Sequence, residues 1–434
     1  MKRVLKIIFC ALIVDFFYFS SGFPITRGVN TKLILAVIGL VTFFIKSAHD
    51  RSMKVSRQMI VLTLLALGVS AATLFSMIYN NTGDRAYLTY VISMLVWLTA
   101  AYMVFVILNA INGKVSIELI ADYIIVISFL QCTIALLGNM FEPVNRFIKF
   151  LYPWVGWLDT VDRMYGIGDT TTLDTGGIRY GIACILCAHM LVKTGANRKK
   201  CIPWYLFAYV FITIVGNMIA RTTLVGSVIG LVYLIVFLAY PHFNSSALLT
   251  KTRVLGWFTV ILAVMIGASV LLYNTNDTIR KNLRFGFEGF FSLAEKGEWD
   301  VGSNNVLRSM YVFPDNPKTW IIGDGYFINP SGDPNYIGEV PNGYYKDTDV
   351  GYLRFIFYFG LVGLGIFSIM ILYAGYICLI RFPGNALLFF SLVLCHFVVW
   401  MKVSTDCFFI LGLFIAMAYV RDNYGKSEQS VLTE

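Results

Sequence analysis

Twelve apolar runs separated by polar segments constrain this chain more than any other feature. A helix needs about 20 apolar residues to cross a bilayer, and irregular backbone cannot face lipid because its polar groups would stay unsatisfied. The runs therefore predict an all-α polytopic membrane protein with about 12 transmembrane helices. They lie at residues 4–22, 32–46, 59–79, 86–108, 117–140, 178–193, 201–219, 222–240, 254–273, 351–380, 385–400 and 404–420.

Composition agrees with this class of protein. Hydrophobic residues make up 58% of the chain and charged residues 14%, whereas charged residues reach about 25% in soluble domains. The net charge of +9 would favour nucleic acid as a partner in a soluble protein. Here many of the basic residues lie in short segments between apolar runs, where they set topology, so nucleic-acid binding is excluded.

The distribution of basic residues predicts the orientation, because cytoplasmic loops are rich in Lys and Arg. With the N-terminus inside, the short outer loops hold fewer bases than the inner segments, so both termini are expected in the cytoplasm and the long connections 141–177 and 274–350 outside. The expected inner bases are Lys2, Arg3, Lys46, Arg51, Lys54, Arg57, Lys114, Lys193, Arg198, Lys199, Lys200, Lys251, Arg253, Arg381, Arg421 and Lys426, and those of the short outer loops are Arg27, Lys32, Arg85, Arg221 and Lys402.

Three regions follow from these boundaries. Residues 1–273 are expected to form a bundle of nine spans, residues 274–350 a large outer loop, and residues 351–434 the last three spans and a cytoplasmic tail. The N-terminus resembles a signal peptide, but Asp15 interrupts its apolar core, so we expect an uncleaved first span. A loop as long as 274–350 favours a folded cap over a plain connector. The aromatic and basic stretch 144–157 is typical of a helix at the membrane surface.

Cysteine, histidine and nucleotide chemistry find no support. None of the cysteines lies in the long loop, and we interpret Cys184 and Cys187, a CxxC pair in an apolar run, as core packing. Neither a metal nor another cofactor is expected. The histidines, His49, His189, His242 and His396, all fall in inner loops or spans, and the chain carries no P-loop, HExxH or GxSxG motif.

The candidate site residues are arginines and aspartates on the predicted outer side. Guanidinium groups match phosphate oxygens in pairs, and a carboxylate beside them can take a proton from a sugar hydroxyl. Together they are typical of glycosyl transfer from a lipid diphosphate without a metal. The candidate substrate-binding residues are Arg221, Arg354, Arg308, Arg284, Arg163 and Arg179, and the candidate catalytic residues are Asp349, Asp347 and Asp324.

Structural roles compete with these interpretations. Arg221, on a hairpin with almost no polar loop, could snorkel to lipid phosphate instead of holding a substrate. Asp349 could be the N-cap of the tenth span. Gly360 and Gly363 are better explained as helix-packing positions than as part of a catalytic site.

Four stretches carry a resemblance to a known family. Asp349, Val350, Gly360 and Gly363 match the spacing of a histidine, a polar residue and two glycines at the end of the long loop in O-antigen ligases. The others are Ala220-Arg221-Thr222, Arg308 within Asn305-Val306-Leu307-Arg308-Ser309-Met310-Tyr311, and Asn316-Pro317 through Gly323-Asp324-Gly325-Tyr326. In this order they make the chain similar to the O-antigen polymerase and ligase family of bacterial envelope glycosyltransferases.

The resemblance implies a membrane glycosyltransferase architecture of the GT-C-like type in the bacterial inner membrane, with a periplasmic loop. It implies transfer of glycan from an undecaprenyl-diphosphate donor to an acceptor sugar, with membrane lipid and a chain-length regulator as further partners. Because Asp349 replaces the ligase histidine, a polymerase is favoured over a ligase. An O-antigen ligase-type glycosyltransferase, a lipid-linked oligosaccharide flippase or other transporter, and a peptidoglycan-type polymerase remain the alternatives.

Overall fold

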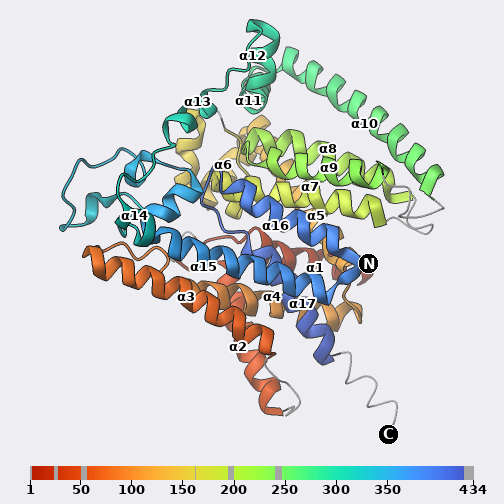
Figure 1. The fold of residues 1–434 in the computed structure, drawn as a ribbon. Helices are drawn as coiled ribbons and strands as arrows, with labels where there is room; N and C mark the ends of the chain where they lie inside the picture. The colour runs from red at the N-terminus through yellow and green to blue at the C-terminus, as the bar shows by residue number, and fades with distance from the viewer. Residues whose placement is uncertain are drawn as a thin grey trace. The chain divides into compact units, whose positions relative to one another are not determined.

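The structure is a computed structural model that describes residues 2–23, 28–49, 56–161, 163–193, 200–239 and 247–424. It is all-α (Figure 1), and among these residues it has eight helices long and apolar enough to cross a membrane, with two shorter apolar helices. The chain is therefore described as a polytopic membrane protein. Each of the predicted apolar runs overlaps a helix. Arg27, Arg51, Lys54, Arg198, Lys199, His242 and Lys426 lie outside the described residues.

Contacts divide the chain into two compact units. Unit 1 comprises Met1–Ile34 with Ile107–Trp299, and unit 2 comprises Leu35–Val106 with Asp300–Glu434. The boundary falls within the predicted outer loop, so its first part, residues 274–299, belongs to unit 1 and the remainder to unit 2.

Unit 1 is built mainly on the packing of α7 against α5, α8 and α9. Gly181 of α7 lies so close to Gly226 of α9 that a Cβ on Gly226 would overlap the backbone of Gly181, which is a close approach that small residues allow. The helices of this unit are α1 (Lys2–Tyr18), α5 (Ile117–Met140), α6 (Glu142–Leu151), α7 (Leu173–Lys193), α8 (Ile202–Ile219), α9 (Thr223–Ala239), α10 (Ala247–Thr275), α11 (Asp277–Gly286) and α12 (Glu288–Lys296), with 3-10 helices at Pro153–Val161 and Gly168–Thr171.

Unit 2 is built around α15, which packs against α3, α14, α16 and α17. Its helices are α3 (Arg57–Asn80), α13 (Gly302–Ser309), α14 (Pro317–Ile322), α15 (Gly351–Arg381), α16 (Ala386–Val399) and α17 (Phe408–Tyr424), with most of α2 (Thr31–His49) and α4 (Tyr90–Asn112). Short 3-10 helices lie at Pro330–Gly332, Tyr345–Asp347 and Pro383–Asn385.

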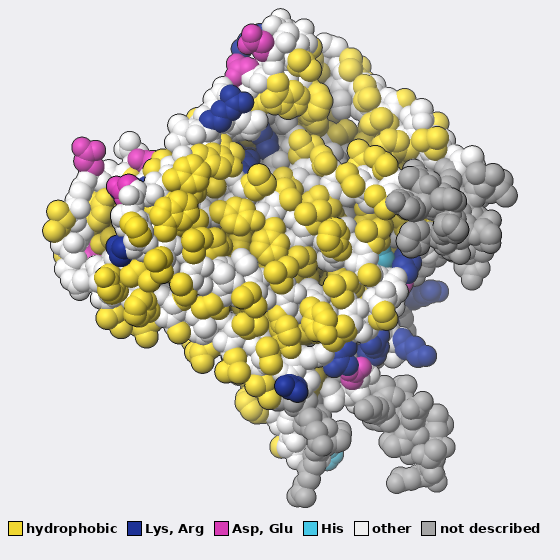
Figure 2. All heavy atoms as spheres, viewed as in Figure 1, with side chains coloured by type: hydrophobic (Ala, Val, Ile, Leu, Met, Phe, Trp, Pro, Cys, Tyr) yellow, Lys and Arg dark blue, Asp and Glu magenta, His cyan; other side chains and the backbone are white. Residues whose placement is uncertain are grey.

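Apolar side chains face outward on several helices. Hydrophobic side chains cover much of the visible face (Figure 2), and on α10 the exposed fraction reaches 60% at Leu255 and 63% at Val264. Water would make such a surface unfavourable, whereas lipid accepts it. The stretch 144–157 is helical as predicted over α6, and it leaves Phe147, Phe150 and Trp154 exposed, as a helix at a membrane surface requires.

Helix α15 bends within the apolar run 351–380 that the sequence predicts to be one span. Phe359 and Gly360 leave helical geometry, and Gly360 has φ +66 and ψ −172, a conformation essentially restricted to glycine. The bend frees the carbonyls of Phe357 and Tyr358 from the helix. They accept from the backbone N–H groups of Asp324 at 2.5 Å and Gly325 at 3.1 Å.

Helix α3 completes this junction. The Ser76 hydroxyl donates to the Tyr358 carbonyl at 2.7 Å, and the Asn80 amide donates to the Gly323 carbonyl at 3.1 Å. A Cβ on Gly360 would overlap the Ile321 carbonyl, and one on Gly323 would overlap the Tyr358 backbone. Gly360 therefore makes the bend possible, and its close approach to Ile321 of α14 agrees with its interpretation as a helix-packing position.

Gly360→Ala should destabilise the protein. The alanine would be held in a conformation that costs about 1–3 kcal/mol, with the overlap at Ile321 in addition. We expect a clear fall in the thermal unfolding temperature of the detergent-purified protein, followed by fluorescence. Gly365→Ala on the same helix is the control, because a Cβ there would meet nothing within 4 Å. An equal effect of the two substitutions would contradict the role of the bend.

Candidate functional site

Arg354, on the first turn of α15, is held on all sides within unit 2. Its guanidinium carbon lies 3.5 Å from the ring centroid of Tyr344 and 3.9 Å from that of Phe327. Nη1 donates to the Ser404 hydroxyl at 2.9 Å, and Nη2 donates to the Phe327 carbonyl at 3.0 Å. With 6% of its side chain exposed, Arg354 fixes the loop to the helix more than it offers a surface for phosphate.

Asp349 lies beside this arginine, with Oδ1 3.5 Å from Nη1 of Arg354. Helix α15 begins at Gly351, its N-cap is Val350, and no side-chain capping bond is made. The interpretation of Asp349 as the N-cap of the span is therefore wrong. A third of the Asp349 side chain is exposed, 33%, so it combines a cationic neighbour with access to solvent.

The other two candidate carboxylates have different surroundings. Asp324 Oδ1 forms an ion pair with Lys318 at 2.7 Å and accepts from the Thr319 hydroxyl at 2.6 Å, and Oδ2 accepts from Tyr345 at 3.2 Å. Burial, followed by the charge of Asp324, raises the pKa of Tyr345 well above its ordinary value. Asp324 therefore holds the loop together. Asp347 is exposed and accepts from the Gly343 N–H at 3.1 Å.

Unit 1 holds four of the candidate arginines, and two of them are structural. Arg179 is buried and donates to the carbonyls of Tyr18 and Thr175 and, at 2.6 Å, to Asp169. Arg284 forms a forked ion pair with Glu295 at 2.8 and 2.7 Å on the surface.

Arg221 and Arg163 share one aromatic ring in unit 1. Their guanidinium carbons lie 4.2 and 4.8 Å from the ring centroid of Phe285. Arg221 Nε also donates to the Phe285 carbonyl at 3.0 Å, and its Nη2 pairs with Glu288 at 2.6 Å. Burial lowers the pKa of Arg163, the charge of Asp174 raises it, and the charge of Arg221 lowers it. An arginine nevertheless stays charged in a protein. Two positive charges therefore gather at Phe285.

Glu288 balances the charge of Arg221. With 14% of its side chain exposed, Arg221 turns into the structure, and Glu288 supplies the anion that such a buried arginine needs. This differs from the snorkelling alternative, in which the arginine reaches out to lipid phosphate. No pattern in the sequence points to Glu288 as the partner of Arg221, because the two are 67 residues apart.

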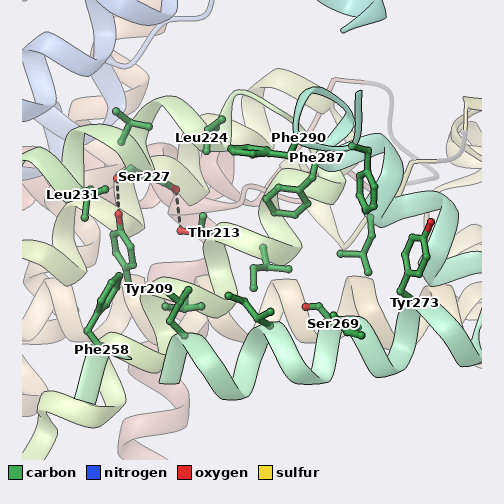
Figure 3. Close-up of a pocket in the computed structure, with 18 residues that line it drawn as sticks. Tyr209, Thr213, Leu224, Ser227, Leu231, Phe258, Ser269, Tyr273, Phe287 and Phe290 are labelled. Carbon is green, nitrogen blue, oxygen red and sulfur yellow. Dashed lines mark hydrogen bonds between the residues drawn. The ribbon is translucent and has the colours of Figure 1, made fainter. Parts of the chain in front are cut away.

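An apolar cavity of about 770 Å³ lies in the same unit (Figure 3). Its walls come from α8, α9, α10, α11 and α12. Three of the polar groups in the wall bond to protein, since the Tyr209 hydroxyl donates to the Ser227 carbonyl and the hydroxyls of Thr213 and Ser227 lie 3.0 Å apart. Phe287 and Phe290 line the cavity and closely follow Phe285 in sequence. The cavity is thus suited to a hydrocarbon chain, and no sequence motif pointed to it.

The predicted site residues thus fall into two groups. Asp349, Asp347, Asp324, Arg354 and Arg308 belong to unit 2, where Arg308 is exposed in the last turn of α13. Arg163, Arg179, Arg221 and Arg284 belong to unit 1. Among the residues that the structure describes, no group of His, Cys, Asp and Glu could hold a metal ion.

Comparisons with protein-family models, curated proteins and solved structures give no match to this chain.

Arg221→Lys tests whether the forked geometry at Phe285 matters. Lysine keeps the charge but loses the second hydrogen-bonding arm, and hydrogen bonds to charged groups contribute about 1.5–3 kcal/mol. We expect at least a tenfold weaker binding of a polyprenyl phosphate, measured by titration of the purified protein. Arg308→Lys, on the exposed end of α13, is the control. Unchanged binding in Arg221→Lys would leave Arg221 only a structural role.

Proposed function

We propose that the chain is a polymerase of lipid-linked oligosaccharide repeat units, such as those of an O-antigen, capsule or exopolysaccharide. It would transfer glycan from an undecaprenyl-diphosphate donor to a sugar hydroxyl on the outer face of the bacterial inner membrane. The proposal includes twelve spans in a GT-C-like arrangement with both termini in the cytoplasm. The observation that carries it is the pair of guanidinium groups at Phe285 together with an apolar cavity in the same unit.

This combination fits the two ends of a polyprenyl diphosphate. The cavity of about 770 Å³ is lined mostly by apolar side chains, and a long hydrocarbon chain requires such a lining. Glu288 balances part of the charge of Arg163 and Arg221, and the remaining positive charge would favour the diphosphate, which is the leaving group of the reaction. Because arginine remains charged, the leaving group can be stabilised by these side chains.

Asp349 would be the general base of the proposed reaction. In the proposed step the carboxylate takes the proton of the acceptor hydroxyl, whose oxygen attacks the anomeric carbon. The bond from that carbon to the phosphate oxygen breaks, and the lipid diphosphate leaves with the electron pair. Arg354, 3.5 Å from Asp349, would help to hold the carboxylate in position.

A transporter of lipid-linked oligosaccharide is the second candidate, favoured by polar pairs inside the apolar helices of unit 1. Tyr205 of α8 donates to Asp122 of α5 at 2.7 Å, and Gln131 of α5 donates to Asp15 of α1 at 3.2 Å. Ionisable residues within spans commonly mark transport pathways. A transporter does not require a base at Asp349, and this separates the two candidates.

Asp349→Asn should abolish polymerisation while leaving the protein folded. The amide retains the shape of the side chain, and Arg354 keeps its bonds to Ser404 and Phe327. Loss of a general base costs roughly a hundred- to ten-thousand-fold in rate. We expect single repeat units instead of a ladder when the variant replaces the wild type in a deletion strain, as judged by electrophoresis of the surface glycan.

Asp347→Asn is the matched control, because it alters an exposed carboxylate two residues away in the same loop. It should leave the ladder intact at normal protein level. Asp349→His restores a group able to accept a proton and should keep more activity than Asp349→Asn. A full ladder with Asp349→Asn would remove Asp349 as the base.

A further inference from the structure

Unit 2 contains a second apolar cavity, of about 220 Å³, among α2, α3, α4 and α17. Phe43 and Phe44, Leu98 and Ile415 are among the carbon groups that line it. Its polar lining groups Thr63 and Thr99 donate to carbonyls one turn back on their own helices, at 2.9 and 2.8 Å. Their hydroxyls are thereby satisfied within the helix, so this cavity also suits a hydrocarbon chain.

A polar cavity of about 140 Å³ adjoins it at the ends of α15 and α17. The two cavities share three lining residues, which makes them neighbours in the same unit: Met59, Ile415 and Tyr419. The polar side is lined by Ser56, Gln58, Arg381, Asp422 and Asn423. An apolar chamber thus lies next to one that can hold a hydrogen-bonding group.

Tyr419 lines both cavities. Its ring contacts those of Phe43 and Tyr102, each with centroids 6.2 Å apart. Within the described part of the chain, the Tyr419 hydroxyl is buried and meets no hydrogen-bond partner. Buried polar groups are nearly always paired, so an unpaired hydroxyl at a cavity wall points to a ligand oxygen that would complete it.

The charges around the polar cavity favour an anion. Arg381 donates from Nη1 to Asp422 and from Nε and Nη2 to the Gln58 side-chain oxygen, at 3.2 and 3.1 Å. Arg421 Nη2 donates to the Arg381 carbonyl at 3.2 Å, so a second guanidinium lies at the same end. Arg57, on the first turn of α3 next to Gln58, adds a third positive charge. Asp422 balances only part of this charge.

We propose that these two neighbouring cavities bind one anionic phospholipid of the bilayer. One acyl chain would occupy the apolar cavity, and the phosphate would lie over the polar cavity, near Arg381, with an ester or phosphate oxygen accepting from Tyr419. This site would be separate from the cavity at Phe287 and Phe290, and it does not depend on the proposed polymerase activity. Amphipathic shape and positive charge together select a phospholipid over water or a peptide.

The test uses native mass spectrometry of the purified full-length protein with equimolar phosphatidylglycerol and phosphatidylcholine. We expect one phosphatidylglycerol to be retained in preference. Tyr419→Phe should weaken its retention roughly 3- to 10-fold, because it removes one hydrogen bond to the lipid. The substitution breaks no bond within the described structure, so folding should be unaffected. Tyr376→Phe, at an exposed tyrosine of α15, is the matched control.

A second variant, Ala416→Phe, fills the apolar cavity and should exclude the acyl chain, whereas the size-exclusion profile should stay that of the wild type. Two results would overturn the proposal. One is equal retention, either of the two lipids by the wild type or of phosphatidylglycerol by the wild type and the Tyr419→Phe variant. The other is displacement of phosphatidylglycerol from this site by an equimolar polyprenyl phosphate, which would make the site a substrate site.

Discussion

The break in α15 at Gly360 is the constraint on which the candidate site of unit 2 depends. A helix that bends within an apolar span exposes carbonyls that no lipid can satisfy. Here the Asp324 and Gly325 N–H groups and the Ser76 hydroxyl satisfy the carbonyls of Phe357 and Tyr358. The same bonds attach the loop after α14 to the span. They also help to place Phe327, three residues after Asp324, against Arg354.

Arg354 then transmits this order to Asp349. Its stacking between Tyr344 and Phe327 and its bond to Ser404 leave the guanidinium little freedom. A carboxylate held near a fixed charge is better organised than one in an open loop, and such organisation is what general-base catalysis requires. In unit 1, Phe285 plays a comparable part for Arg163 and Arg221, because one ring and one carbonyl fix two flexible side chains.

The sequence predicted the helices well and their interactions poorly. Apolar runs identify helices because the backbone N–H and C=O groups of a run in lipid must bond to one another, as they do in a helix. Every predicted run overlaps a helix. The bend at Gly360 was missed because it rests on bonds to residues 323–325 and to Ser76, far away in sequence. Glu288 and the apolar cavity were missed for the same reason. The sequence left the contact of Asp349 and Arg354 undecided, because two residues five positions apart on a helix lie on different faces. The contact forms because Asp349 precedes the helix.

Reconstitution tests the central claim most directly. The purified chain would be placed in liposomes with a synthetic undecaprenyl-diphosphate-linked oligosaccharide, and the glycans would be separated by size while released lipid diphosphate is measured. The account predicts oligomers of two or more repeats, with one lipid diphosphate released for each new linkage. Unextended glycan that merely moves from one leaflet to the other, with no lipid diphosphate released, would contradict it and identify a transporter.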